Sequence, residues 1–190
     1  MSFYEGVVQP EGEGCDNKAR NLLYLLHHSR YNGKMRLALY QPDIAPNVGT
    51  LLRLGACLGV AVDIIEPCGF PFGARDLKRA VMDYGDAADV TRHISWSEFQ
   101  KATGDSRLIL LTTRATMAYT DFAFRESDIL LLGRESAGVP KTVHEAADAR
   151  LLIPMTAGMR SINVAISASM VLGEALRQTN SFPRFTPLQD

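Results

Sequence analysis

The chain has 190 residues, of which 46% are hydrophobic and 22% are charged, and its formal net charge is −1. These values are ordinary for a folded domain and exclude a collagen-like, coiled-coil or wholly disordered chain. The near-neutral balance argues against attachment to nucleic acid by bulk charge, but it is compatible with a local basic patch.

Five short apolar runs, each ending in a turn, have the length and composition of parallel strands buried on both faces of a sheet. Helical spacing of apolar residues lies between most of them, and this alternation predicts a doubly wound α/β domain with a mostly parallel sheet. The predicted strands are Arg36–Tyr40, Ala61–Ile65, Leu108–Leu111, Asp128–Leu132 and Leu151–Ile153, and the predicted helices are Val48–Leu58, Ala74–Met82, Trp96–Ala102 and Ser161–Gln178.

The regular pattern covers residues 35–180, which we predict to be a single domain. Residues 1–34 differ from it in pattern, and we expect them to be a dispensable N-terminal extension. Residues 181–190 form a C-terminal tail. No apolar stretch approaches the roughly 20 residues of a membrane span, and the N-terminus lacks the pattern of a signal peptide.

Cysteine and histidine usage predicts neither a disulfide framework nor a metal site. The three cysteines include no CxxC pair, and reduced cysteines are typical of a cytoplasmic protein. Cys57 lies in an apolar run and is expected in the core. The histidines are scattered and are expected at the surface or at helix caps; they are His27, His28, His93 and His144.

Three segments contain more small and polar residues than packing requires: 46–53, 132–140 and 153–163. Each begins at or just beyond the end of a predicted strand, where open parallel sheets build ligand sites. Any one of them could be an ordinary turn, but their shared location predicts a site. The glycine-rich fingerprints of dinucleotide and nucleoside-triphosphate binding are absent, as are the HExxH metalloprotease and GxSxG hydrolase motifs.

Taken together, these segments resemble the SpoU branch of the SPOUT RNA methyltransferases. The first carries the Asn-x-Gly-x-x-x-Arg pattern, the second a strand followed by Gly-x-Glu and Gly-Val-Pro, and the third Ile-Pro-Met followed by Ser-x-Asn-Val. The compact length, Ile65-Glu66-Pro67, Asp83-Tyr84 and Leu111-Thr112-Thr113 are similar to the minimal TrmL-type subgroup, which methylates tRNA. The matching motif residues are Asn47, Gly49, Arg53; Gly133, Glu135, Gly138, Val139, Pro140; and Ile153, Pro154, Met155, Ser161, Asn163, Val164.

The resemblance implies a deep trefoil knot in the last third of the chain, whose loops hold S-adenosylmethionine in a bent shape. No metal is implied. Small residues in such loops let backbone groups approach the adenine and read its edge by hydrogen bonds. The implied cofactor-binding residues are Leu111, Thr112, Gly133, Ile153, Met155 and Ser161.

The resemblance also implies a catalytic set of Arg53, Glu135, Asn47 and Asn163. Methyl transfer from a sulfonium depends mainly on positioning and electrostatics. A guanidinium keeps its proton, so Arg53 is expected to contact the target ribose or its phosphate and to lower the cost of forming the alkoxide. Glu135 would orient Arg53 or another donor, and the two asparagines would position the reactants. Arg134 departs from the family pattern, in which proline or a small residue is frequent.

The expected function is 2′-O-methylation of the wobble nucleotide, a cytidine or modified uridine, in the tRNA anticodon loop. Two alternatives stay open: methylation of another RNA such as ribosomal RNA, and a catalytically silent RNA-binding relative. We also expect a homodimer, because the last predicted helix is weakly polar around much of its circumference. A basic patch that contacts RNA phosphates is predicted at Arg75, Lys78 and Arg79, with Arg92 as a further member.

Overall fold

The computed structural model describes residues 33–71 and 89–184. The expected N-terminal extension falls outside them except for its last two residues, as does the predicted helix Ala74–Met82. The remaining elements follow in chain order: β1 (Arg36–Tyr40), α2 (Ala45–Leu58), β2 (Ala61–Ile65), β3 (Val90–His93), α4 (Trp96–Thr103), β4 (Leu108–Leu111), β5 (Met117–Ala118), the 3₁₀ turn η2 (Tyr119–Asp121), β6 (Ile129–Leu132), α5 (Lys141–Ala146), β7 (Ala149–Leu152) and α6 (Val164–Thr179).

The described strands form one parallel sheet of seven in the order β3-β2-β1-β6-β4-β7-β5. The sequence therefore predicted the α/β class and the parallel sheet correctly, and the five predicted strands are present with ends shifted by at most two residues. The pattern missed β3 and β5, which form the two edges of the sheet. Both strands are short and mostly not fully buried, as is common at sheet edges, so neither forms a continuous apolar run in the sequence.

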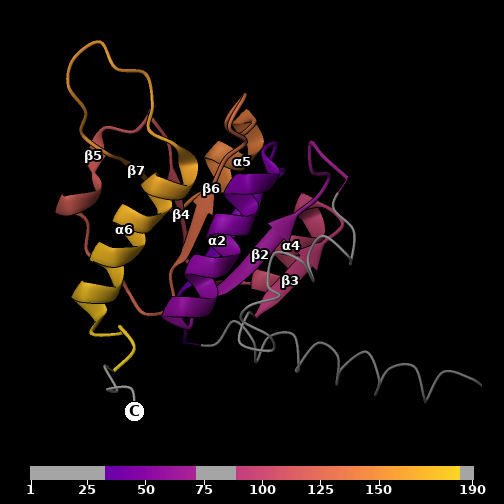
Figure 1. Cartoon of the computed structure of the whole chain (residues 1–190), viewed down its shortest axis with the longest axis horizontal. Helices are drawn as coiled ribbons and strands as arrows, with labels where there is room; N and C mark the ends of the chain where they lie inside the picture. The colour runs from indigo at the N-terminus through magenta and orange to yellow at the C-terminus, as the bar shows by residue number, and fades with distance from the viewer. Residues whose placement is uncertain (1–32, 72–88, 185–190) are drawn as a thin grey trace, which may run out of the picture.

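Helices cover both faces of the sheet (Figure 1). Side chains alternate between faces along each strand, so Leu37 and Leu39 of β1 pack in the cluster that contains α2 and α6. Ala38 and Tyr40 pack in the opposite cluster, with residues of α4 and α5. Both faces are thus buried, which is the reason that the strands appear as continuous apolar runs in the sequence.

The helix ends explain why the loops at this edge of the sheet are well defined. Pro46 lies in the first turn of α2, where the missing N–H has no helical partner to lose. The Asn163 side chain caps α6 by accepting hydrogen bonds from the N–H groups of Ala165 (2.9 Å) and Ile166 (3.3 Å). The last helix therefore begins at Val164 rather than at the predicted Ser161.

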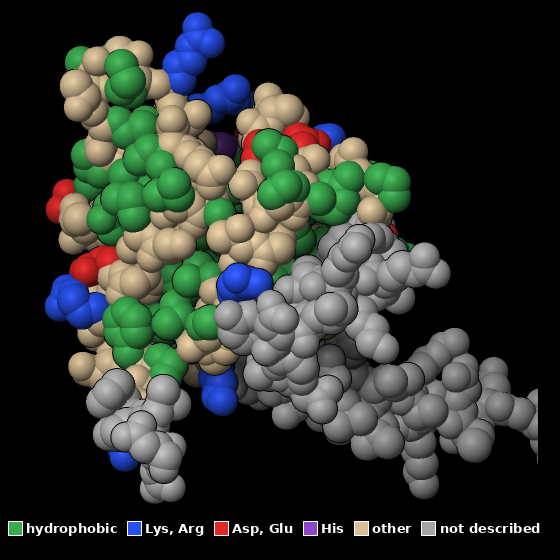
Figure 2. All heavy atoms as spheres, in the orientation of Figure 1, with side chains coloured by type: hydrophobic (Ala, Val, Ile, Leu, Met, Phe, Trp, Pro, Cys, Tyr) green, Lys and Arg blue, Asp and Glu red, His purple; other side chains and the backbone are tan. Residues whose placement is uncertain are grey.

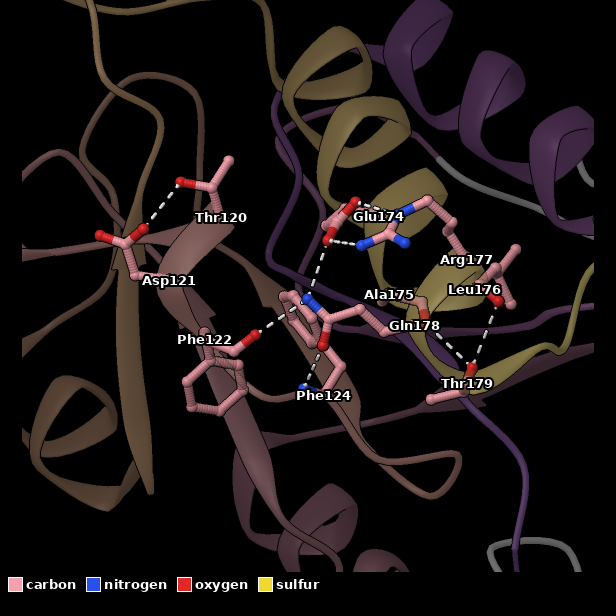
Figure 3. A network of polar contacts seen from close by, with 10 residues as sticks. All are labelled: Thr120, Asp121, Phe122, Phe124, Glu174, Ala175, Leu176, Arg177, Gln178 and Thr179. Carbon is pink, nitrogen blue, oxygen red and sulfur yellow. Dashed lines mark hydrogen bonds and ion pairs between the residues drawn. The ribbon is translucent and has the colours of Figure 1, made fainter.

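The C-terminal end of α6 is tied to the segment that precedes β6 (Figure 3). Gln178 donates to the carbonyl of Phe122 and accepts from the N–H of Phe124, both at 3.0 Å. Glu174 bonds to Arg177 and to Gln178 at 2.8 Å, and the Arg177 guanidinium lowers the pKa of Glu174 to about 2. Gln178 thus connects the last turn of α6 to the segment before β6.

Two sequence expectations were wrong. Cys57 is exposed, because α2 buries Leu51, Leu52 and Gly55 and residue 57 falls on the other side of the helix. His93 is 4% exposed rather than at the surface, since it ends β3 beneath α4 and packs edge-on against Phe99. No helix in the described part of the chain is long and apolar enough to cross a membrane.

Candidate active site

A cleft of about 360 Å³ opens at the carboxyl ends of β4, β6 and β7, beside the N-termini of α2 and α6. All six residues that were predicted to bind the cofactor line it, although they come from three separate loops. Three of the four residues predicted to be catalytic line it too. These nine residues are Leu111, Thr112, Gly133, Ile153, Met155, Ser161, Asn47, Glu135 and Asn163.

Arg53 is the predicted site residue that does not line the cleft among the described residues. It lies on the exposed side of α2. Six residues separate it from Asn47, and this spacing turns a side chain by about 240° around a helix. One helix therefore presents Asn47 to the cleft and Arg53 to another surface.

A chain of hydrogen bonds joins the predicted catalytic carboxylate and amides. Asn47 Nδ2 donates to Glu135 Oε1 at 2.9 Å, and Asn163 Nδ2 donates to Asn47 Oδ1 at 3.0 Å. Asn163 in turn caps α6. Glu135 thus accepts a hydrogen bond from Asn47 and holds its amide in place. These contacts join three loops that are far apart in the sequence and fix both amide groups at the cleft.

A second set of contacts, which the sequence did not reveal, surrounds Asp43 in the loop after β1. Arg134 donates through Nε (3.0 Å) and Nη2 to Asp43 Oδ1, while Ser136 donates through its N–H (3.2 Å) and its hydroxyl to Oδ2. The N–H of Asp43 donates to Glu135 Oε2 at 2.8 Å. The hydrogen bonds from Arg134 and Ser136 lower the pKa of Asp43 to about 2. We call Asp43, Arg134 and Ser136 the loop clamp.

At Gly133, just after β6, the backbone is packed too tightly for a side chain. Arg134 and Gly138 exchange two backbone hydrogen bonds, at 3.0 and 2.8 Å, and Gly138 has a φ of 68°. A Cβ placed on Gly133 would lie 2.9 Å from the Gly138 carbonyl carbon. This tight turn presents main-chain groups to the cleft, as a site that reads a ligand through backbone atoms requires.

The family is decided by comparison with known proteins. Residues 34–173 match the model of the SpoU rRNA Methylase family.

The chain belongs to the SpoU methylase family.

Relatives within this family are named tRNA (cytidine(34)-2′-O)-methyltransferase. The one from Ancylobacter novellus is 56% identical over 153 residues, which are 79% of this chain and 96% of the relative. The one from Escherichia coli K12 is 38% identical and covers 76% of this chain and 93% of the relative. A solved structure described as giving insights into the 2-OH methylation of C/U34 on tRNA is 36% identical, with a TM-score of 0.71. The match covers 77% of this chain and 96% of that chain.

The expected basic patch is not placed by the structure. Arg75, Lys78 and Arg79 lie outside the described residues, and Arg92 forms an ion pair with Glu66 at 2.6 Å. Figure 2 shows other Lys and Arg side chains projecting from the upper edge of the molecule, where the loops of the cleft lie.

Proposed function

We propose that this SpoU family member is an S-adenosylmethionine-dependent methyltransferase that modifies the ribose 2′-hydroxyl of the wobble nucleotide in tRNA, a cytidine or a modified uridine. The observation that carries the proposal is the convergence of Asn47, Glu135 and Asn163 on the cleft that is lined by the residues predicted to bind the cofactor. Relatives at 56% and 38% identity carry names for this activity.

The cleft suits S-adenosylmethionine in size and chemistry. Its volume of about 360 Å³ lies within the range of small-molecule sites, roughly 300–1,000 Å³. The tight turn at Gly133 and the apolar walls at Leu111 and Ile153 would hold the adenine between main-chain groups. When bound, S-adenosylmethionine supplies an electrophilic methyl group.

The residues of this chain act mainly by positioning. Two fixed amides, of Asn47 and Asn163, offer oriented polar groups beside the cleft without the entropy cost of ordering them during the reaction. We infer that Arg53 contacts the RNA from the exposed side of α2 and stabilises negative charge on the ribose or its phosphate, since a guanidinium stays protonated.

The experiment is methyl transfer to a tRNA whose wobble nucleotide carries either a 2′-hydroxyl or a 2′-hydrogen. Only the first should accept a methyl group, because an unpaired anticodon nucleotide exposes its 2′-hydroxyl. Transfer to the 2′-deoxy tRNA would exclude this acceptor atom. Methyl transfer to ribosomal RNA but not to tRNA would leave the family membership unchanged and would contradict tRNA as the substrate.

The role of Arg53 is tested in the same assay. Arg53→Ala should slow methylation by about 10²–10³-fold, while calorimetry should find S-adenosylmethionine binding nearly unchanged because Arg53 lies outside the cleft. The matched control is Arg114→Ala, another exposed arginine outside the cleft lining. An equal loss in both variants would mean that general charge, rather than Arg53, supports the reaction.

We also propose a homodimer that uses the outer face of α6. Ile166 and Met170, four residues apart on this helix, are 55% and 38% exposed. Figure 2 shows hydrophobic side chains over the region of α6. A second copy would cover such an apolar face. Light scattering should give twice the chain mass, and Ile166→Asp with Met170→Asp should reduce it to 20.9 kDa; a stable 20.9 kDa species without these changes would contradict the proposal.

Three further expectations remain proposals. The last third of the chain forms a trefoil knot, the protein acts in the cytoplasm where tRNA is modified, and residues 1–34 are dispensable. The last is supported by the family match, which begins at residue 34, and by a relative that is covered to 96% by 79% of this chain. A shortened chain that begins at Met35 should keep a cooperative thermal transition and cofactor affinity.

A further inference from the structure

Arg134 and Glu135 bring one positive and one negative charge to the lining of the cleft, beside the Asp43 carboxylate that pairs with Arg134. Among the described residues that line it, Arg134 and Glu135 are the charged ones. The other lining side chains are apolar, small or uncharged polar groups. A ligand that carries both signs of charge would therefore find one partner for each at this one turn.

The guanidinium of Arg134 is held in a defined position by the loop clamp. Its Nε and Nη2 both donate to Asp43 Oδ1, and Ser136 occupies the other oxygen of Asp43. The Arg134 side chain is 34% exposed, and its third nitrogen, Nη1, makes no hydrogen bond to the described residues. A donor that is ordered in advance binds an anion without the entropy cost of fixing a free arginine.

S-adenosylmethionine carries one anionic group, the carboxylate of its methionine part, and two cationic groups, the sulfonium and the ammonium. Carboxylates are preferred partners of guanidinium groups because the donors and acceptors match in geometry. Glu135 has its two oxygens fixed by Asp43 and Asn47 and contributes negative charge for the cationic part. The two adjacent residues therefore complement both charges of this ligand.

We propose that Arg134, held by Asp43, binds the carboxylate of the methionine part of S-adenosylmethionine. The inference rests on the proposed function, because it assumes that S-adenosylmethionine occupies the cleft. An RNA phosphate has related chemistry, but Arg134 lines the cleft together with the residues predicted to bind the cofactor, and this favours the carboxylate.

The experiment compares two probes by calorimetry on the full chain. S-adenosylhomocysteine keeps the carboxylate, whereas 5′-methylthioadenosine has the same adenosine and thioether without the amino-acid group. Arg134→Gln removes the charge but keeps a donor for Asp43. It should weaken S-adenosylhomocysteine binding about 10- to 100-fold, the size expected for one charged hydrogen bond, and leave 5′-methylthioadenosine binding unchanged.

The matched control is Arg177→Gln, because Arg177 forms a similar pair with Glu174 outside the cleft. This variant should change the affinity for neither S-adenosylhomocysteine nor 5′-methylthioadenosine. Arg134→Ala is a second variant, and its unchanged 5′-methylthioadenosine affinity would show that the turn remains folded. If Arg134→Ala lowers the affinity for 5′-methylthioadenosine, the proposal is tested by the Arg134→Gln variant alone.

Each other outcome counts against the inference. Equal weakening of both probes in Arg134→Gln would assign Arg134 a structural role. Unchanged binding of both probes would exclude the carboxylate contact, and a weaker tRNA affinity in that case would assign Arg134 to an RNA phosphate. Failure of the unsubstituted protein to bind S-adenosylhomocysteine at all would instead overturn the proposed function, and the inference with it.

Discussion

Two polar networks in this protein use the same kinds of side chain in different surroundings. In the first, Arg36 Nε donates to Asp63 Oδ2 at 2.7 Å, and His93 Nε2 lies 2.8 Å from Asp63 Oδ1. It joins β1, β2 and β3, and each of its three residues is at most 4% exposed. In the second, Glu135, Asn47 and the loop clamp join loops around the open cleft.

The difference between them is access to water. A charged side chain that is buried in the folded protein needs an oppositely charged or hydrogen-bonding partner, because an unpaired buried charge is strongly unfavourable. Groups at an open cleft can regain water when a partner is lost, so their loss costs less stability. We therefore expect the buried network to contribute mainly to stability, and the network at the cleft to contribute more to binding and catalysis than to stability.

The largest expected effect is that of Asp63→Asn, which replaces the buried carboxylate between Arg36 and His93 by a neutral amide. The free energy of unfolding should fall by about 3–5 kcal/mol, as when one partner of a buried pair is removed. Urea denaturation measures it. Glu98→Gln, which removes the exposed pair with Lys101, is the control and should cost at most about 1 kcal/mol. Equal losses in the two variants would contradict the argument that burial makes the Asp63 carboxylate more important for stability than an exposed one.

Glu135→Ala should lower the methylation rate strongly and the stability only moderately. It removes the acceptor for Asn47 and for the N–H of Asp43. Misplacement of groups that position the reactants costs about 100-fold in rate, so we expect that loss in single-turnover methylation. The free energy of unfolding should fall by about 1–3 kcal/mol, because two part-buried hydrogen bonds to the carboxylate are lost but their donors lie where water can reach them. Full activity in this variant would show that Glu135 does not position the reactants.

Gly133→Ala tests whether the cleft network depends on the close backbone approach at the end of β6. The added Cβ would contact Gly138 at 2.9 Å, so the turn must move, at a cost of about 1–3 kcal/mol. Cofactor affinity should fall as well. Gly49→Ala is the control, since nothing lies within 4 Å of its Cβ, and within α2 it should leave stability unchanged or raise it by up to about 1 kcal/mol. A neutral Gly133→Ala would contradict the close packing.

The smallest effect concerns pH and the loop clamp. The pKa of Asp43 is lowered from 3.8 to about 2, chiefly by its hydrogen bond with Arg134. A carboxylate whose pKa is lowered in the folded state stabilises the fold at pH values above its ordinary pKa. This contribution is lost as the pH falls toward about 2. The stability difference between the unsubstituted protein and Asp43→Asn should be constant from pH 5 to 8 and shrink below pH 4. Urea denaturation at pH 6, 4 and 2.5 measures it; a difference that changes near neutral pH would contradict this prediction.

Much of the site was predictable because family motifs and strand ends are local features of the sequence. Glu135 lies in a Gly-x-Glu motif after β6, and Asn163 lies in a Ser-x-Asn-Val motif before α6, so both could be named in advance. Asp43 could not, since an acidic residue before a helix is common and its partners Arg134 and Ser136 lie 91 and 93 residues away.

The amino-acid sequence by itself determined the parallel strands, most of the helices between them and the identity of the loops that form the cleft. It did so because buried strands and helical faces impose short-range periodicities. Only the tertiary structure decided which polar side chains meet. It placed Asp63 against Arg36 and His93 in the interior, and it separated Arg53 from the cleft although Asn47 lies on the same helix. Such pairings depend on how distant strands and loops are brought together, and no local pattern in the chain encodes them.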